Sequence, residues 1–308
     1  MIDFRYHLVS IVSIFLALAV GIALGAGPLK GTLSDTINSE IASLRSDKAK
    51  LNQQLATANR GIDERDAFIA ATNGQLLGGR LVGQTVDLVV LPGTDGSLVK
   101  DTTATMSESG AKVGGTVEIK SAWVDPSAKQ AREQVGDTLV RHLGLQPEDD
   151  QSDLNRSLAT ALQTDSEQTS SSVLKALGDA KLISVDRDKV TPATAVVVLS
   201  DTVDATPTSL ATSQARAFVN LAVALDAKLT SSVLASNTAV DPGSGVSVVS
   251  TARTMGSAAR NLSTVDDAGI PMGQASIALA LLDESQGRSG QYGLGGDASD
   301  PFPAAVGS

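Results

Sequence analysis

The 308-residue sequence predicts an α/β protein in which an N-terminal transmembrane helix and a long coiled-coil helix precede a three-layer domain with a mostly parallel sheet. Three observations predict this order. An uncharged apolar run lies near the start, a heptad pattern follows it, and the remainder alternates short β-branched runs with helix-like stretches. We therefore divide the chain into a transmembrane anchor (1–30), a coiled-coil stalk (31–79), an α/β globular domain (80–286) and a flexible tail rich in glycine and proline (287–308).

The apolar run extends from Leu8 to Leu29, and no fully charged side chain lies between Arg5 and Lys30. A helix rises about 1.5 Å per residue, so roughly 20 such residues cross the hydrocarbon core of a bilayer, which is about 30 Å thick. The run predicts one membrane-spanning helix that ends near Gly27-Pro28. A cleavable signal peptide is the alternative, although its apolar region usually covers only about 7 to 15 residues. The short preceding segment favours a cytoplasmic amino terminus, which places the C-terminal domain outside the cytoplasm.

A heptad pattern occupies the proline-free stretch from Gly31 to Leu77. Alternating spacings of four and three residues over several heptads are typical of a coiled coil, so we expect a homodimer or homo-oligomer formed through this stalk. A single amphipathic helix folded back on the domain is the alternative. Charged residues at two core positions favour few strands, and hence a dimer over a tetramer. Eight of the ten core positions are apolar. Heptad position a is occupied by Ile41, Lys48, Leu55, Ile62 and Ile69, and heptad position d by Ile37, Leu44, Leu51, Ala58 and Arg65.

Beyond the stalk, apolar β-branched runs alternate with helix-like stretches. A strand, a helix and a second strand form a βαβ unit, which implies a parallel sheet. The clearest strand, Ala195–Leu199, is apolar throughout and is therefore expected to be buried on both faces. We expect an acidic, partly helical insertion at 147–168 and a flexible tail from Gly287. The expected strands are 85–91, 115–119, 195–199, 229–235 and 262–265, the expected helices are 96–110, 126–144, 173–177, 209–227 and 273–282, and a further unit begins at 246–250.

Composition excludes several kinds of partner and site. Residues 81–308 carry 16 Lys and Arg against 27 Asp and Glu, and the whole chain has a net charge of −10. An acidic surface repels phosphate backbones, so we expect no nucleic-acid partner. The chain has no cysteine, which excludes disulfides, thiolate nucleophiles and thiolate metal sites.

Parallel α/β domains often bind ligands beyond the carboxyl ends of their strands. Gly93, Asp95, Gly96 and Ser97 follow the first strand and form the candidate pocket, and an ordinary tight turn is the alternative. The dinucleotide-binding glycine pattern, the phosphate-binding Gly-Lys-Ser/Thr loop and the Gly-x-Ser-x-Gly elbow of hydrolases are all absent. If the domain were an enzyme after all, Asp95 and Ser97 would be the first positions to test.

The remaining titratable residues do not complete a catalytic set. His142 lies near the end of a predicted helix, where it can interact with the carbonyl dipoles. Asp266 and Asp267 precede Gly269 and Pro271, which indicates a strand-exit turn that caps the last helix. We therefore predict that the protein is not an enzyme, and we assign no catalytic residue, metal ligand or cofactor.

Particular residue strings also carry a family resemblance. These strings are the opening from Met1 to Leu29, Val265-Asp266-Asp267 with Pro271, Gly273 and Gln274, and Gly290-Gln291-Tyr292-Gly293. Through them the chain resembles, from end to end, the actinobacterial family of the mycobacterial copper transport protein B. The resemblance implies an envelope protein of the outer membrane that takes part in copper efflux, with the copper ion as the transported species and an oligomeric pore as its route. Some relatives are instead described as envelope proteins that act with a partner in cell division and cell separation.

The residues do not supply a specific copper site. Copper(I) favours Cys and Met and copper(II) favours His, yet Cys is absent and Met106, Met255 and Met272 are widely spaced. A membrane β-barrel would show alternating segments and aromatic girdles, but only 3% of the residues are aromatic. Two hypotheses follow: a protein of copper efflux, and a membrane-anchored coiled-coil scaffold that presents its α/β domain to an envelope partner.

Overall fold

The computed structural model describes residues 4–26, 28–186, 192–241 and 243–304. The chain divides into two compact units, Met1–Arg65 and Asp66–Ser308. The first unit consists of helices, and the second contains the sheet. The two units are described separately below.

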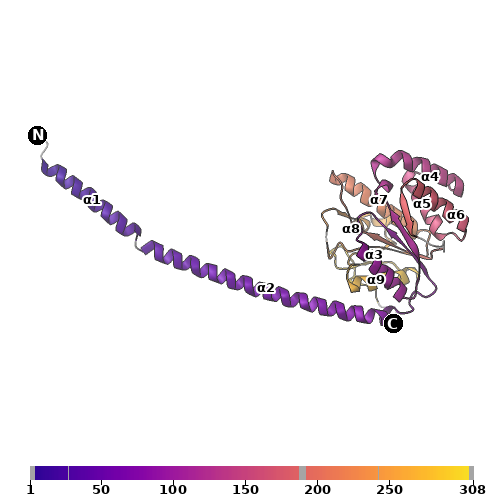
Figure 1. Ribbon diagram of the computed structural model, residues 1–308, viewed down its shortest axis with the longest axis horizontal. Helices are drawn as coiled ribbons and strands as arrows, with labels where there is room; N and C mark the ends of the chain where they lie inside the picture. Colours follow the sequence, from indigo (N-terminus) through magenta and orange to yellow (C-terminus); the bar gives the residue numbers. More distant parts are fainter. Residues whose placement is uncertain (1–3, 27, 187–191, 242, 305–308) are drawn as a thin grey trace. The chain divides into compact units, whose positions relative to one another are not determined.

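The N-terminal helix α1 (Phe4–Ala26) contains the predicted membrane span (Figure 1). Residues Phe4–Gly25 are long and apolar enough to cross a membrane. None of this segment is buried within the chain. The predicted apolar helix is confirmed, while Gly27, at its predicted end, lies outside the described residues.

The second helix, α2 (Pro28–Leu77), is 50 residues long and begins with proline at its first position, where no backbone donor is needed. At about 1.5 Å per residue such a helix is about 75 Å long. Six apolar heptad residues between Ile37 and Ile62 are 40–67% exposed. Pairing with a second copy therefore stays a prediction. The exposed set is Ile37, Ile41, Leu44, Leu51, Leu55 and Ile62.

The second unit is built on a seven-stranded sheet with the order β3-β2-β1-β4-β6-β8-β9. All neighbours pair in parallel except the edge strand β3, which is antiparallel to β2. A separate antiparallel pair joins β5 to β7. The mostly parallel sheet is confirmed. The strands are β1 (Thr85–Val90), β2 (Lys112–Ile119), β3 (Ile183–Asp186), β4 (Ala195–Ser200), β5 (Thr202–Val203), β6 (Ser231–Ser236), β7 (Val246–Ser247), β8 (Ser263–Val265) and β9 (Gln291–Tyr292).

Helices cover both faces of this sheet, which gives the three predicted layers (Figure 1). Alternate residues of β1 separate the two cores: Val89 belongs to one cluster, and Val86 and Leu88 belong to the other. The end of α2, α3 (Gly96–Glu108) and α9 (Pro271–Glu284) pack on the Leu88 face. The Val89 face is covered by α4 (Lys129–Leu143), α5 (Asp150–Gln163), α6 (Glu167–Asp179), α7 (Thr208–Asp226) and α8 (Val248–Thr254).

The segment 147–168 is partly helical, as predicted, but its interpretation as an insertion is wrong, because α5 is a core helix. Its residues Leu154, Leu158 and Leu162, spaced four apart, are fully buried. The acidic residues that suggested an insertion begin the helix instead. Asp149 is its N-cap and accepts hydrogen bonds from the backbone of Gln151 and Ser152, at 3.1 and 3.0 Å. Carboxylates at a helix N-terminus are stabilised by its dipole, so this acidity marks a helix start.

The stretch predicted as a tail contributes an edge strand. Gln291 and Tyr292 of β9 pair in parallel with β8, and Tyr292 is only 7% exposed. Sequence reasoning placed these residues outside the domain because glycine dominates their surroundings. Here Gly293 adopts a φ of +133°, which a residue with a side chain rarely does. Residues 305–308 of the predicted tail lie outside the described part of the chain.

Candidate functional site

The pocket predicted from Asp95 and Ser97 exists as a hollow of about 160 Å³ at the carboxyl ends of β1, β4 and β6. Asp95 is the N-cap of α3, and the backbone N–H of Ser97 donates to its Oδ1 at 2.6 Å. This hydrogen bond, with a further one from the Ser97 side chain, lowers the pKa of Asp95. A carboxylate with a lowered pKa is a poor general base, so the geometry favours a capping role. We call this hollow the aspartate hollow; Asp95, Ser97, Leu98, Asp101, Ser200, Asp201, Asn237, Asp241 and Gly269 line it.

The predicted pocket residues do not all meet in this hollow. Gly93 lines a neighbouring hollow of about 500 Å³ with Pro92, between β1 and β4. This is where the strand order reverses, the position at which α/β sheets commonly bind ligands. Sequence reasoning placed these residues at the carboxyl edge of the sheet, where the hollows lie, but did not separate the hollows.

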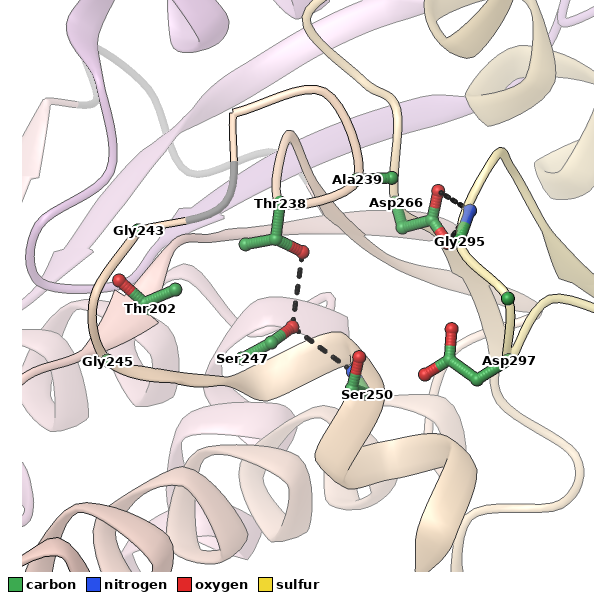
Figure 2. A pocket seen from close by; sticks show the side chains of 11 residues that line it. Thr202, Thr238, Ala239, Gly243, Gly245, Ser247, Ser250, Asp266, Gly295 and Asp297 are labelled. Carbon is green, nitrogen blue, oxygen red and sulfur yellow. Dashed lines mark hydrogen bonds between the residues drawn. The ribbon is translucent and has the colours of Figure 1, made fainter. Parts of the chain in front are cut away.

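A third hollow, of about 370 Å³, lies further along the same edge (Figure 2). Sequence reasoning did not predict it, because its residues come from segments far apart in the chain. Hydroxyl groups from the β5, β6 and β7 segments and from α8 face it, together with two carboxylates. We call it the hydroxyl hollow, lined by Thr202, Thr238, Ala239, Gly243, Gly245, Ser247, Ser250, Asp266, Gly295, Gly296 and Asp297.

Arg253 of α8 holds one wall of the hydroxyl hollow together. Its guanidinium bonds to Asp266 at 2.5 Å and to Asp297 at 2.7 Å, and it also donates to the carbonyl of Tyr292 at 2.7 Å. The arginine side chain is only 2% exposed. Asp266 additionally accepts the backbone N–H of Leu294 and Gly295. Arg253 therefore fastens β8, β9 and the C-terminal segment to one another.

Asp267 follows Asp266 but occupies a different environment. Its side chain is fully buried, and neither carboxylate oxygen has a hydrogen-bond partner among the described residues. Burial, and secondarily the charge of Asp266, raises the pKa of Asp267 to about 6. The predicted strand-exit turn is present, since Ile270 N–H donates to the Asp267 carbonyl. The predicted capping is wrong, because the N-cap residue of α9 is Ile270 and no side chain caps it.

His142 lies away from these hollows. It occupies the last turn of α4, as predicted, and its Nε2 is 3.1 Å from the Ser172 hydroxyl of α6. The Ser172 hydroxyl in turn donates to the carbonyl of Thr169. This pair joins two neighbouring surface helices, which fits a packing contact.

The described residues do not offer copper a ligand set. Met106 and Met255 pack in the clusters on opposite faces of the sheet. Within the described ranges, no group of three or more His, Cys, Asp or Glu side chains is placed to hold a metal ion. The hollows instead present hydroxyl and carboxylate oxygens, which suit hard cations better than copper.

Two residues that form one wall of the hydroxyl hollow escaped sequence reasoning: Asp297, which lines it, and Arg253, which is buried behind the lining. Arg253 stands in a short Thr-Ala-Arg-Thr stretch with no distinctive spacing, and Asp297 lies in the glycine-rich segment that suggested a tail. The one available signal was Asp266 directly after a buried strand, since a buried carboxylate requires a partner.

Comparison with known proteins gives a consistent result. The chain matches the family described as "Copper transport outer membrane protein, MctB" over residues 1–303. It is 26% identical to the copper transporter MctB of Mycobacterium tuberculosis (strain ATCC 25618 / H37Rv) over 309 residues, which cover 96% of this chain and 97% of the relative. It is 28% identical to the copper transporter MctB of Mycobacterium leprae (strain TN) over 320 residues, with the same coverage.

Proposed function

Because this chain belongs to the MctB family of copper transport outer membrane proteins, we propose that it takes part in copper efflux as a single-pass protein of the cell envelope, with the copper ion as the transported species. The match over residues 1–303 carries this proposal, because it includes the apolar helix, the long helix and the α/β unit together. The relatives are named as transporters rather than as enzymes.

The apolar helix sets a condition on how such a protein could transport an ion. Within the described residues, α1 alone is long and apolar enough to span a membrane. A single helix encloses no aqueous path, because a pore needs several helices or a closed barrel around it. The proposal therefore includes an assembly of several copies, or a partner that supplies the channel, in the outer membrane or another layer of the envelope. The α/β unit is proposed to lie outside the cytoplasm.

The heptad face of α2 supports the assembly of copies. Its six exposed apolar residues would be covered by the same residues of a second parallel copy. In such a dimer, residues at heptad position a contact position a of the partner helix, and residues at position d contact position d. Burying each Leu or Ile contributes about 1.5–3 kcal/mol. A pair of Leu51→Asn and Leu55→Asn substitutions should lower the fraction of dimer in sedimentation of the full chain. Gln53→Asn with Gln54→Asn, outside the heptad core, is the matched control, and equal sedimentation of both variants would contradict the pairing.

Deletion of the gene tests the transport role directly. We expect raised cell copper and greater sensitivity to copper, with no change in zinc content, and rescue by the full-length chain. Rescue should fail with the Leu51→Asn and Leu55→Asn chain if assembly through α2 is needed. Unchanged copper content in the deletion strain would overturn the proposal.

A second function, that of a scaffold, is favoured by the oxygen-rich hollows, which do not suit copper. In this alternative the α/β unit binds an envelope partner in cell division or cell separation, and the two helices hold it at the membrane. Crosslinking in intact cells followed by purification of the full chain should then recover a stoichiometric partner. Recovery of none would count against the scaffold and leave the transport proposal unaffected.

A further inference from the structure

The hydroxyl hollow has the dimensions of a small-molecule site. Its volume of about 370 Å³ falls within the range of about 300–1,000 Å³ that is typical of ligand pockets. Figure 2 shows Thr238, Ser247 and Ser250 on one side and Asp266 and Asp297 on the other, with open space between them. This site is independent of the copper role proposed above.

Hydrogen bonds within the protein fix the walls of the hollow. Thr238 Oγ1 and Ser247 Oγ are 3.1 Å apart, and the backbone N–H of Ser250 donates to Ser247 Oγ at 3.2 Å. On the opposite wall, Arg253 holds Asp297. Walls that are already ordered lose little entropy when a ligand binds, so the hollow is preorganised.

The charges at the hollow exclude anions and disfavour metal ions. Asp266 and Asp297 line it, whereas Arg253 is buried behind them and is paired with both, and no Lys or Arg is among the described lining residues. A phosphate or carboxylate would therefore meet two like charges. The oxygens of Asp266 are occupied by Arg253 and by the N–H groups of Leu294 and Gly295, so this residue is not available to coordinate a cation.

The polar groups that remain match one class of ligand. A hydroxyl donates one hydrogen bond and accepts others, and a carboxylate accepts about four. The Asp297 side chain is 38% exposed and engages Arg253 and Ser250, which leaves acceptor capacity toward the hollow. The lining residues include no aromatic ring and no aliphatic side chain larger than that of Ala239, so their apolar contacts come from backbone carbons and short side chains. We propose that the hydroxyl hollow binds a neutral polyhydroxylated ligand of about the size of one saccharide unit, through the hydroxyls of Thr238 and Ser250 and the carboxylate of Asp297.

The glycines of the hollow supply a way to block it. A Cβ at Gly243 would lie 2.4 Å from Thr202 Oγ1, so a side chain there would push the wall apart. A Cβ at Gly296 would meet no atom within 4 Å, and the φ of this residue is not in the left-handed region. Gly296→Leu should therefore reduce the space in the hollow without straining the fold. Gly178 of α6 is equally open and does not line the hollow, so Gly178→Leu is the matched control.

Ligand-observed NMR on the full chain in phospholipid nanodiscs, which carry no sugar, tests the proposal. D-glucose and N-acetylglucosamine are the probes, and inorganic phosphate is the competitor. At least one saccharide should show saturation transfer with a Kd on the order of 1–10 mM, and phosphate should not displace it. Gly296→Leu and Ser250→Leu should each raise that Kd about fivefold or more, while Gly178→Leu should bind as the wild type does.

Three results would overturn the proposal. These are no transfer from either saccharide at about 50 mM, displacement by phosphate, and wild-type affinity in both blocked variants. Thermal unfolding of each variant provides the folding check. If Ser250→Leu unfolds early, the comparison of Gly296→Leu with Gly178→Leu decides alone.

Discussion

The two units of the chain use the same apolar residue types in opposite ways. In the helical unit, Leu16, Leu44 and Leu55 are 61–67% exposed, whereas in the α/β unit Leu88 and Leu158 are fully buried. A buried leucine stabilises the fold of its own chain, and a long exposed row of them requires a surface from elsewhere. The α/β unit therefore encodes its own core, and we propose that the helical unit instead encodes contacts with a membrane and with another protein chain. The predictions below test this contrast.

The largest effect is expected in α1. Ile14→Asp combined with Leu18→Asp places two carboxylates in the middle of the span, and each costs about 2.5–3.5 kcal/mol of insertion free energy. We expect the full chain to leave the membrane pellet on carbonate extraction. Val82→Asp is the control, because Val82 is 71% exposed on the α/β unit and no membrane is expected to contact it. A double variant that stays in the pellet would show that something other than α1 holds the chain.

The next largest effect concerns the ion pairs of the α/β unit. Arg253→Leu leaves the carboxylate of Asp266, whose side chain is 4% exposed, without its cation. Removing one partner of a buried ion pair typically costs about 3–5 kcal/mol of unfolding free energy. Lys175→Leu removes the exposed pair with Asp179 and should cost less than about 1 kcal/mol. Denaturant unfolding measures both, and equal losses would mean that Arg253 does not fasten the sheet edge.

The sequence predicted the elements whose periodicity is local. The run Ala195–Leu199 became the central strand β4, and the heptads gave one helix from Pro28 to Leu77, because these patterns repeat within a few residues. The partly helical character of the α5 segment was predicted, but the segment was placed outside the core because Asp149 and Asp150 gave it an acidic beginning. The stripe of leucines that buries the helix was not recognised. The same segment carries acidic residues at its start and leucines at helical spacing, and the burial of the leucines places the helix in the core.

Of the hollows at the carboxyl edge of the sheet, the sequence predicted only the part formed by the segment after β1. Asp95 and Ser97 follow a strand directly, so topology alone placed them at the carboxyl edge. The hydroxyl hollow gathers Thr202, Ser250 and Asp297, which are separated by dozens of residues and belong to segments with weak local patterns. The pairing of Arg253 with Asp297 depends on β9 joining the sheet, and a two-residue strand among glycines carries no periodicity to reveal it.

Two leucine truncations sharpen the contrast between the units. Leu158→Ala in α5 should lower the unfolding free energy of the α/β unit by about 2–5 kcal/mol, because a fully buried side chain leaves a cavity. Leu55→Ala in α2 should leave that unfolding transition unchanged, since Leu55 is 61% exposed in the single chain. If two copies pair, Leu55→Ala should instead change the concentration dependence of dimer dissociation. A loss of α/β stability in Leu55→Ala would indicate that α2 folds back on the domain.

The smallest effect distinguishes two carboxylates within the α/β unit by pH. Burial raises the pKa of Asp267 to about 6, so its ionised form destabilises the folded state. That penalty is absent below the unfolded pKa of about 4, grows as the pH rises, and is complete above about 6. Asp267→Asn should therefore stabilise the protein by about 2–3 kcal/mol at pH 7 relative to its effect at pH 4. Asp226 and Glu284, whose pKa values burial raises to about 6 and about 7, titrate in the same window, so the difference between variant and wild type is the quantity to measure.

Asp95→Asn is the control of opposite sign, because hydrogen bonds from Ser97 lower the pKa of Asp95 and its contribution is lost only as the pH falls below about 4. If both variants shift the stability curve in the same direction between pH 4 and 7, the contrast between the buried and the exposed carboxylate is wrong.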